Sequence, residues 1–142
     1  MGLDAVVYVN ASNLAFGVKG TDWEIDYLTG EVSTQNLDLS KYYPKELFID
    51  IKKRFGNTSM IGYLREEVKS VMSEDSVILD KILYSGSHSG DVIGREFLNS
   101  LEQELEILTA RGNQSAQLAK FLEDLSELIE SSRRQKNPIV FI

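Results

Sequence analysis

Short runs of β-branched and aromatic residues stand near the start and at the end of the chain. Asp4–Val9 reads Asp-Ala-Val-Val-Tyr-Val, and Ile139–Ile142 reads Ile-Val-Phe-Ile. Residues of these types favour strands, because their side chains pack well on a pleated, half-buried surface. Four such residues would not remain in water, so Ile139–Ile142 is predicted to join the sheet as a terminal strand. The chain must therefore fold so that its last residues return to a sheet.

Two amphipathic segments before the last strand predict a helical hairpin. Phe97–Ala110 and Leu118–Arg134 carry leucine, isoleucine and phenylalanine at helical spacing. Residues 111–114 separate these helices, and Asn137-Pro138 stops the second one, because the residue before a proline is biased away from helical geometry. A further amphipathic helix is expected over Thr58–Met72.

The first part of the chain predicts a hairpin followed by a loop. Trp23–Leu28 alternates apolar and polar residues, and Glu31–Thr34 follows after Gly30. Because glycine can supply the positive φ of a tight turn, we predict a β-hairpin here. Residues 36–43 are expected to form a loop that turns Leu37 and Leu39 inward.

Two segments are compatible with both a helix and a strand. Pro44–Phe55 is predicted as a helix that Gly56 ends, because its apolar residues fall on one helical face. A strand over Leu47–Ile51 is the rival interpretation. Val77–Tyr84 is a short apolar run that suits either structure, and we favour a strand over Lys81–Tyr84.

The composition is that of a soluble globular protein. Of the 142 residues, 42% are hydrophobic and 26% are charged, which suits one domain of ordinary size. We predict a single α+β domain over residues 1–142. Its small, mostly antiparallel sheet combines the N-terminal strands, the hairpin and the C-terminal strand. About four helices, including the C-terminal helical hairpin, are expected to cover that sheet.

Charge and cysteine content narrow the range of functions. The chain holds no cysteine, which excludes disulfides, thiol catalysis and thiolate metal sites and suits a reducing cytoplasm. Its net charge of −7 would repel phosphate backbones, so we expect no nucleic-acid partner. No apolar run approaches the ~20 residues of a membrane span. Because no signal peptide is recognised either, we expect a cytoplasmic protein without membrane contact.

The only histidine lies in a loop rich in glycine and serine, Ser85-Gly86-Ser87-His88-Ser89-Gly90-Asp91. The loop lacks the motifs of known phosphate-binding loops. We expect Ser89 or Asp91 to cap the following helix, and His88 to hydrogen-bond within its own loop. The functional alternative makes His88 a general acid or base beside Asp91, with Ser85, Ser87 and Ser89 as further binding residues. A lone histidine does not build the usual metal site, and no metal or cofactor is expected.

The second candidate site is the acidic face of the helical hairpin. Its carboxylates alternate with the apolar stripe and should mostly face solvent; they are Glu102, Glu104, Glu106, Glu123, Asp124, Glu127 and Glu130. The simplest interpretation is a solvated helix face. The functional interpretation is a docking surface on which Glu123, Glu127 and Glu130 attract a basic protein. Five aromatic residues are expected to be half-buried supports: Trp23, Tyr27, Tyr42, Tyr43 and Tyr63. The alternative is that Tyr42-Tyr43 forms an exposed interface anchor.

Many small, acidic, cysteine-free bacterial proteins without a catalytic signature are immunity proteins or antitoxins. Membership of that class predicts a cytoplasmic protein-binding module whose carboxylates steer a basic toxin domain. One alternative is a small enzyme or ligand-binding protein that uses His88 and Asp91. Another alternative is a structural homo-oligomer that binds no ligand.

Overall fold

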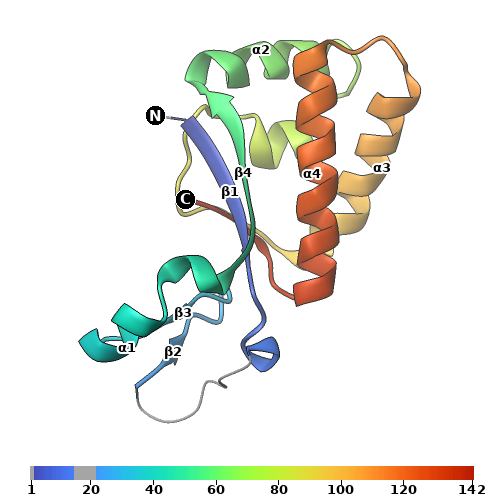
Figure 1. Ribbon diagram of the computed structural model, residues 1–142. Helices are drawn as coiled ribbons and strands as arrows, with labels where there is room; N and C mark the ends of the chain where they lie inside the picture. Colours follow the sequence, from blue (N-terminus) through green and yellow to red (C-terminus); the bar gives the residue numbers. More distant parts are fainter. Residues whose placement is uncertain (1, 15–21) are drawn as a thin grey trace.

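The computed structural model describes residues 2–14 and 22–142, and its main sheet is antiparallel. Four strands follow the order β4–β1–β6–β5 (Figure 1). They are β1 (Gly2–Tyr8), β4 (Ile49–Asn57), β5 (Val92–Ile93) and β6 (Ile139–Phe141). The predicted α+β class is confirmed, and the predicted C-terminal strand occupies an inner position between β1 and β5.

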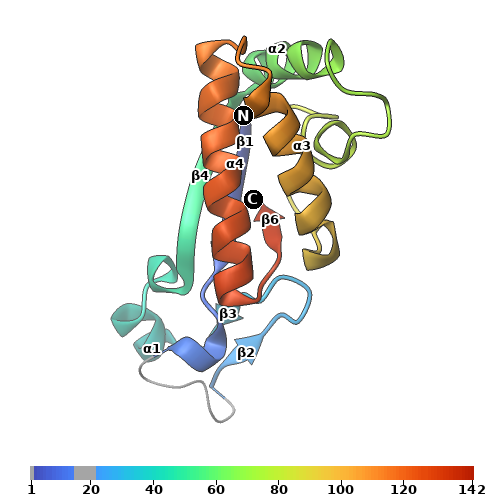
Figure 2. The same cartoon turned by 90° about the vertical axis from the view of Figure 1, so that its right-hand side faces the viewer.

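Four α-helices accompany the sheet within the described residues. They are α1 (Leu37–Tyr42), α2 (Thr58–Lys69), α3 (Leu98–Ala110) and α4 (Ala116–Gln135). Helices α3 and α4 lie side by side as the predicted helical hairpin (Figure 2). Short 3-10 turns occupy Ala11–Asn13, Lys45–Phe48 and Arg95–Phe97. Among the described helices, none is long and apolar enough to cross a membrane.

The main core lies between one face of the sheet and the helices (Figure 1). Helix α4 packs on β1 and β4, helix α2 packs on β4, and α3 covers α4 from the side. Because side chains alternate along a strand, β1 sends Leu3, Ala5 and Val7 into this core. Its intervening residues Val6 and Tyr8 are buried on the opposite face, in a smaller cluster.

Strand β4 replaces the helix predicted over Pro44–Phe55, and that prediction is wrong. The pairing of β1 with β4 shifts by one residue next to Tyr8, which makes a β-bulge at Asp50. As a result Ile49 and Ile51 pack on opposite faces of the sheet although they are two residues apart. The bulge breaks the period of two in the sequence, so the apolar residues imitate helical spacing. The rival strand over Leu47–Ile51 overlaps β4 at its last residues.

Gly56 allows β4 to run directly into α2. Its φ of 140° lies where side chains are strained, and a Cβ there would come within 2.6 Å of the Met60 side chain. The side chain of Asn57 then caps α2 by accepting a hydrogen bond from the Met60 N–H at 2.8 Å. Gly56 therefore marks a strand-to-helix turn, whereas the sequence predicted a helix end.

The strand predicted over Lys81–Tyr84 is also wrong, because Ile78–Ile82 forms a π-helical turn. The carboxylate of Glu104 accepts hydrogen bonds from the N–H groups of Val77, at 2.7 Å, and Ile78, at 3.2 Å. This carboxylate belongs to α3, far along the sequence. The group that caps the π-helical turn therefore comes from a distant segment, and the local sequence of residues 77–84 does not reveal it.

The loop predicted over residues 36–43 is replaced by α1. The Asn36 side chain caps this helix by accepting hydrogen bonds from the N–H groups of Asp38 and Leu39. Leu37, predicted to turn inward, is 78% exposed, and α1 contains no buried residue. The cap explains the helix, because asparagine is among the preferred N-cap residues.

The predicted hairpin is present, but it does not join the main sheet. Strands β2 (Glu24–Ile25) and β3 (Val32–Ser33) pair only with each other. Gly30 has a φ of 82°, as the turn prediction required. The hairpin and α1 lie together at the end of the molecule opposite α2 (Figures 1 and 2).

Replacing Leu125 by alanine tests the core assigned to α4. Leu125 is fully buried, so Leu125→Ala should lower the free energy of unfolding by about 2–5 kcal/mol. Ile107→Ala is the matched control, because Ile107 is 54% exposed on α3 and should cost less than about 1 kcal/mol. Urea denaturation measures both values, and equal losses would contradict the assigned core.

Candidate functional site

The loop with the histidine leads into β5, not into a helix. Its backbone continues the sheet, because the Gly90 N–H donates to the Phe141 carbonyl at 2.8 Å and the Phe141 N–H donates to the Asp91 carbonyl at 2.9 Å. The prediction that Ser89 or Asp91 caps the next helix is therefore wrong. Ser85 hydrogen-bonds within the loop, to Ser87, and the side chains of Ser87 and Ser89 are exposed.

The ring of His88 is held among groups from three segments. Its Nε2 lies 2.8 Å from the carbonyl oxygen of Ile82, which can only accept, so Nε2 carries the proton. The ring stacks on Tyr84 at 4.6 Å and meets Phe141 edge-on at 4.4 Å. Only 5% of the side chain is exposed. The ring therefore packs the loop against β6.

Asp91 lies beside this ring and completes a small polar cluster. Nδ1 of His88 is 3.2 Å from Oδ2 of Asp91, but the contact lacks hydrogen-bond geometry, so this buried nitrogen has no hydrogen-bond partner among the described residues. The Tyr84 hydroxyl donates to the same carboxylate. This hydrogen bond, together with burial, raises the pKa of Tyr84 to about 12. The structure thus brings together His88 and Asp91, which were predicted, and Tyr84, which was not.

Two carboxylates of the predicted solvated face are buried, so the prediction is wrong for them. Glu104 caps the π-helical turn, and Asp124 lies 2.7 Å from the Lys120 ammonium and 3.6 Å from that of Lys53. Hydrogen bonds and ion pairs satisfy both carboxylates inside the fold, which lowers the cost of burying them. They therefore contribute to structure and not to an outer surface.

The three carboxylates predicted to dock a partner lie along α4 in different surroundings. Glu127 is 2.5 Å from the Lys53 ammonium, and the pKa of Lys53 is raised mainly because Glu127 accepts its hydrogen bond. Glu130 lies 3.9 Å from Arg134. Glu123 and Glu127 both border a groove between α3 and α4, whereas Glu130 does not.

This α3–α4 groove has a volume of about 380 Å³ and a mixed lining. It is lined by Leu105, Thr109, Gln114, Ala119, Leu122, Glu123, Ser126 and Glu127. The Oε1 atom of Gln114 is buried there and accepts no hydrogen bond within the described part of the chain. Sequence reasoning missed Gln114, because nothing in its local pattern distinguishes it from other residues of the interhelix turn.

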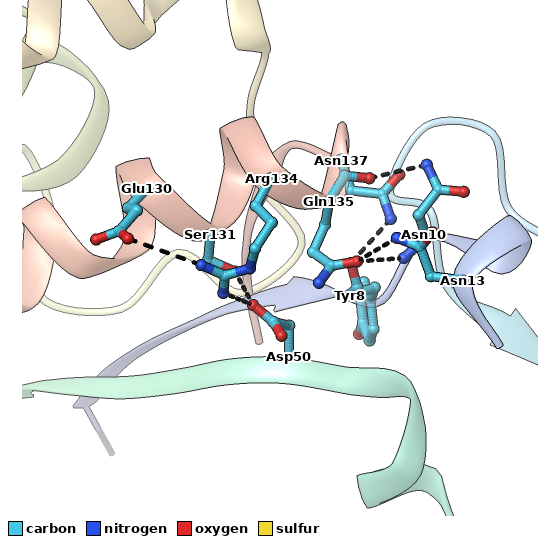
Figure 3. Close-up of polar contacts among 9 residues, drawn as sticks. All are labelled: Tyr8, Asn10, Asn13, Asp50, Glu130, Ser131, Arg134, Gln135 and Asn137. Atoms are coloured by element: carbon cyan, nitrogen blue, oxygen red, sulfur yellow. Dashed lines mark hydrogen bonds and ion pairs between the residues drawn. The ribbon is translucent and has the colours of Figure 1, made fainter. Parts of the chain in front are cut away.

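A polar network at the other end of α4 fixes this helix to the sheet (Figure 3). The bulge turns Asp50 toward α4, where its carboxylate accepts hydrogen bonds from the Ser131 hydroxyl and the Arg134 guanidinium, each at 2.5 Å. Burial alone would raise the pKa of Asp50, but these bonds and the Arg134 charge outweigh it and hold the pKa below 3.8. The carboxylate is therefore a structural anion.

Gln135 and Asn137 extend this network to the strand that precedes the hairpin (Figure 3). The Gln135 side-chain oxygen accepts from the Asn10 N–H at 2.9 Å, and the Asn137 amide donates to the Tyr8 carbonyl at 2.9 Å. Because these side chains satisfy backbone groups where β1 ends, they determine how the chain leaves the sheet toward the hairpin.

Comparison of the chain with models of protein families, with curated proteins and with solved structures finds no match. The chemistry of the two sites is therefore the basis for assigning a function. The His88 cluster is packed and internally bonded. The α3–α4 groove, by contrast, is open to solvent and presents carboxylates beside apolar side chains.

His88→Ala tests the packing role of the ring. The change removes a buried ring and leaves the Ile82 carbonyl without its donor, so it should lower the free energy of unfolding by about 2–4 kcal/mol. Asp91→Asn is the control, because replacing this half-exposed carboxylate should lower the free energy of unfolding by less than about 1 kcal/mol. Urea denaturation distinguishes the two, and a larger loss in Asp91→Asn would contradict the packing role.

Asp50→Asn tests the charge at the bulge through the pH dependence of stability. Because the folded pKa of Asp50 is lowered, its contribution is present above pH 3.8 and is lost as the pH falls through the folded pKa. At about pH 7 the variant should be less stable by about 1–3 kcal/mol, the usual worth of charged hydrogen bonds. This difference in the free energy of unfolding should shrink under acid conditions. The control is Asp80→Asn, at a largely exposed carboxylate, which should change the free energy of unfolding very little at either pH.

Proposed function

We propose that this chain is an acidic protein-binding module that takes up a basic segment of its partner in the α3–α4 groove. The observation that carries the proposal is the lining of that groove. Leu105 and Leu122 supply apolar contact, while Glu123 and Glu127 supply carboxylate oxygens at its border, although Glu127 also pairs with Lys53. A lysine or arginine side chain has the matching form, an aliphatic stem with a cationic head.

The buried acceptor of Gln114 supports the same chemistry. An unsatisfied buried polar atom costs about 1–3 kcal/mol. A donor in the groove would recover that free energy once the Gln114 side chain turns its amide oxygen toward the groove. Arginine and lysine carry only donors in their charged groups. The groove therefore favours a cationic side chain over an acidic or a purely apolar one.

An inhibitor of immunity-protein or antitoxin type is the function that fits this chemistry best. Such an inhibitor meets a basic toxin domain in the cytoplasm, and complementary charge accelerates the encounter. The net charge of −7 is suited to that steering. The enzyme alternative is less well supported, because Nε2 of His88 is committed to the Ile82 carbonyl and its ring is buried.

Carboxylate neutralisation on the groove tests the proposal. The tagged chain is purified from its native host, and association kinetics are then measured with the purified partner. The partner should be basic, and the combined change of Glu123→Gln and Glu127→Gln should slow association about three- to tenfold at low salt. The off-rate should change less, because steering acts mainly on the encounter.

The control combines Glu66→Gln with Glu74→Gln, two exposed carboxylates outside the groove. This variant removes the same charge and should leave the on-rate within about twofold of the parent. An acidic partner, or an association rate that depends neither on salt nor on the groove carboxylates, would exclude this function.

A further inference from the structure

The β2–β3 hairpin, residues 22–34, concentrates negative charge. It holds Asp22, Glu24, Asp26 and Glu31 and no lysine or arginine. None of these carboxylates forms an ion pair with a described residue, unlike Glu127 of α4. Their field reaches Tyr8, whose pKa is raised by burial and then by the charges of Glu31 and Asp26.

The tip of the hairpin presents two adjacent apolar side chains to solvent. Tyr27 is 92% exposed and Leu28 is 79% exposed, so neither acts as the half-buried support that the sequence suggested for Tyr27. Tyrosine is among the residues that contribute most at protein interfaces. Tyr27 and Leu28 therefore stand in solvent on a hairpin whose carboxylates form no ion pair with a described residue.

Hydrogen bonds within the turn hold this tip in one conformation. The Asp26 carboxylate accepts from the Leu28 N–H at 2.9 Å, and the Asp26 carbonyl accepts from the Gly30 N–H at 2.7 Å. The Asp26 N–H in turn donates to the Glu31 carbonyl at 2.9 Å. A turn that is ordered before binding loses little conformational entropy when it binds.

The hairpin is also fixed to the body of the protein. Gly30 approaches Asn137 so closely that a Cβ would come within 2.4 Å of its side chain, and Asn137 is itself bonded to the Tyr8 carbonyl (Figure 3). At the base, the ring of Trp23 meets Tyr43 and Phe48 edge-on at 5.7 Å. The hairpin is therefore a rigid projection and not a loose loop.

A recess of about 290 Å³ lies at the base of the hairpin. It is lined by Asp22, Glu24, Gln35 and Asn36, so two carboxylates and two amides face it. This lining offers acceptors for a cationic side chain, in the same way as carboxylates that bind arginine. Asp22 and Glu24 of this recess belong to the hairpin that carries the apolar tip, whereas Gln35 and Asn36 lie between the hairpin and α1.

We infer that residues 22–34 form a second docking element, for a partner surface that is both basic and apolar. Tyr27 and Leu28 enter an apolar hollow of that partner, and the carboxylates meet its lysine and arginine side chains. The inference rests on the proposed function for the basic character of the partner, but it assigns the contact to a surface separate from the α3–α4 groove.

A defined peptide probe tests this assignment directly, with no need to identify the partner. The probe is a synthetic peptide of lysine and leucine, and the control peptide replaces each lysine by glutamate. Amide chemical shifts of the full chain are recorded during titration with each peptide. We expect the basic peptide to shift the amides of residues 22–34, and the acidic peptide to leave them unchanged.

Two matched double variants then identify the side chains responsible. Tyr27→Ala with Leu28→Ala should weaken binding of the basic peptide by about tenfold or more, because interface tyrosines are frequent hot spots. Leu37→Ala with Tyr42→Ala removes an equally exposed pair on α1 and should change binding less than about twofold. All four side chains are largely exposed, so both variants should keep the thermal midpoint of the parent.

The possible outcomes separate this inference from the proposed function. Shifts confined to the α3–α4 groove would overturn the hairpin assignment and leave the proposed function in place. Shifts at neither surface would overturn both, and equal shifts with the acidic peptide would remove charge as the basis of recognition. Equal weakening by the two double variants would show that the hairpin tip is not the contact.

Discussion

The antiparallel pairing of β6 with two partners holds the two ends of this fold together. Val140 pairs with Val6 of β1 and with Val92 of β5, so a three-residue strand closes the sheet. Its backbone also anchors the loop before β5, because Phe141 exchanges hydrogen bonds with Gly90 and Asp91. Since a short strand is stable only inside a sheet, β6 and its neighbours depend on one another.

Buried and exposed carboxylates have different tasks in this protein. Glu104 and Asp124 are buried, and the side chain of Asp50 is 20% exposed. Asp50 and Asp124 join α4 to β4, and Glu104 joins α3 to the π-helical turn. Removing one partner of such a group leaves a buried charge, which is far more costly than losing a surface pair. The carboxylates of the β2–β3 hairpin form no ion pair with a described residue.

The first half of α4, which borders the groove, lies toward the α2 end of the molecule, and the β2–β3 hairpin lies at the opposite end (Figures 1 and 2). The α3–α4 groove is a recess formed by two long helices, and the hairpin is a projection held by Asn137 and Trp23. The α3–α4 groove can accept a side chain of the partner, whereas the hairpin tip can enter a hollow of the partner. Both surfaces offer hydrogen-bond acceptors beside apolar groups, so both favour lysine and arginine side chains of a partner.

The sequence by itself determined the elements whose pattern is local. Helices α2, α3 and α4, the last strand and the turn at Gly30 follow from apolar periodicity, caps and glycine, and the α+β class follows from them. It also brought His88 and Asp91 into one candidate site, because they share a loop. A local pattern contains no information on contacts between distant segments.

Tertiary structure decided the remainder. The bulge at Asp50 made β4 resemble a helix in sequence, and a carboxylate from α3 turned the expected strand before Tyr84 into a π-helical turn. Which carboxylates are paired, buried or free also depends on residues that only the fold places nearby. Glu104 and Glu106 are two residues apart and look alike in sequence, yet one is a buried cap and the other is exposed. The free energy of a charged side chain depends on its neighbours in space, because desolvation and ion pairing vary with distance and not with separation along the chain.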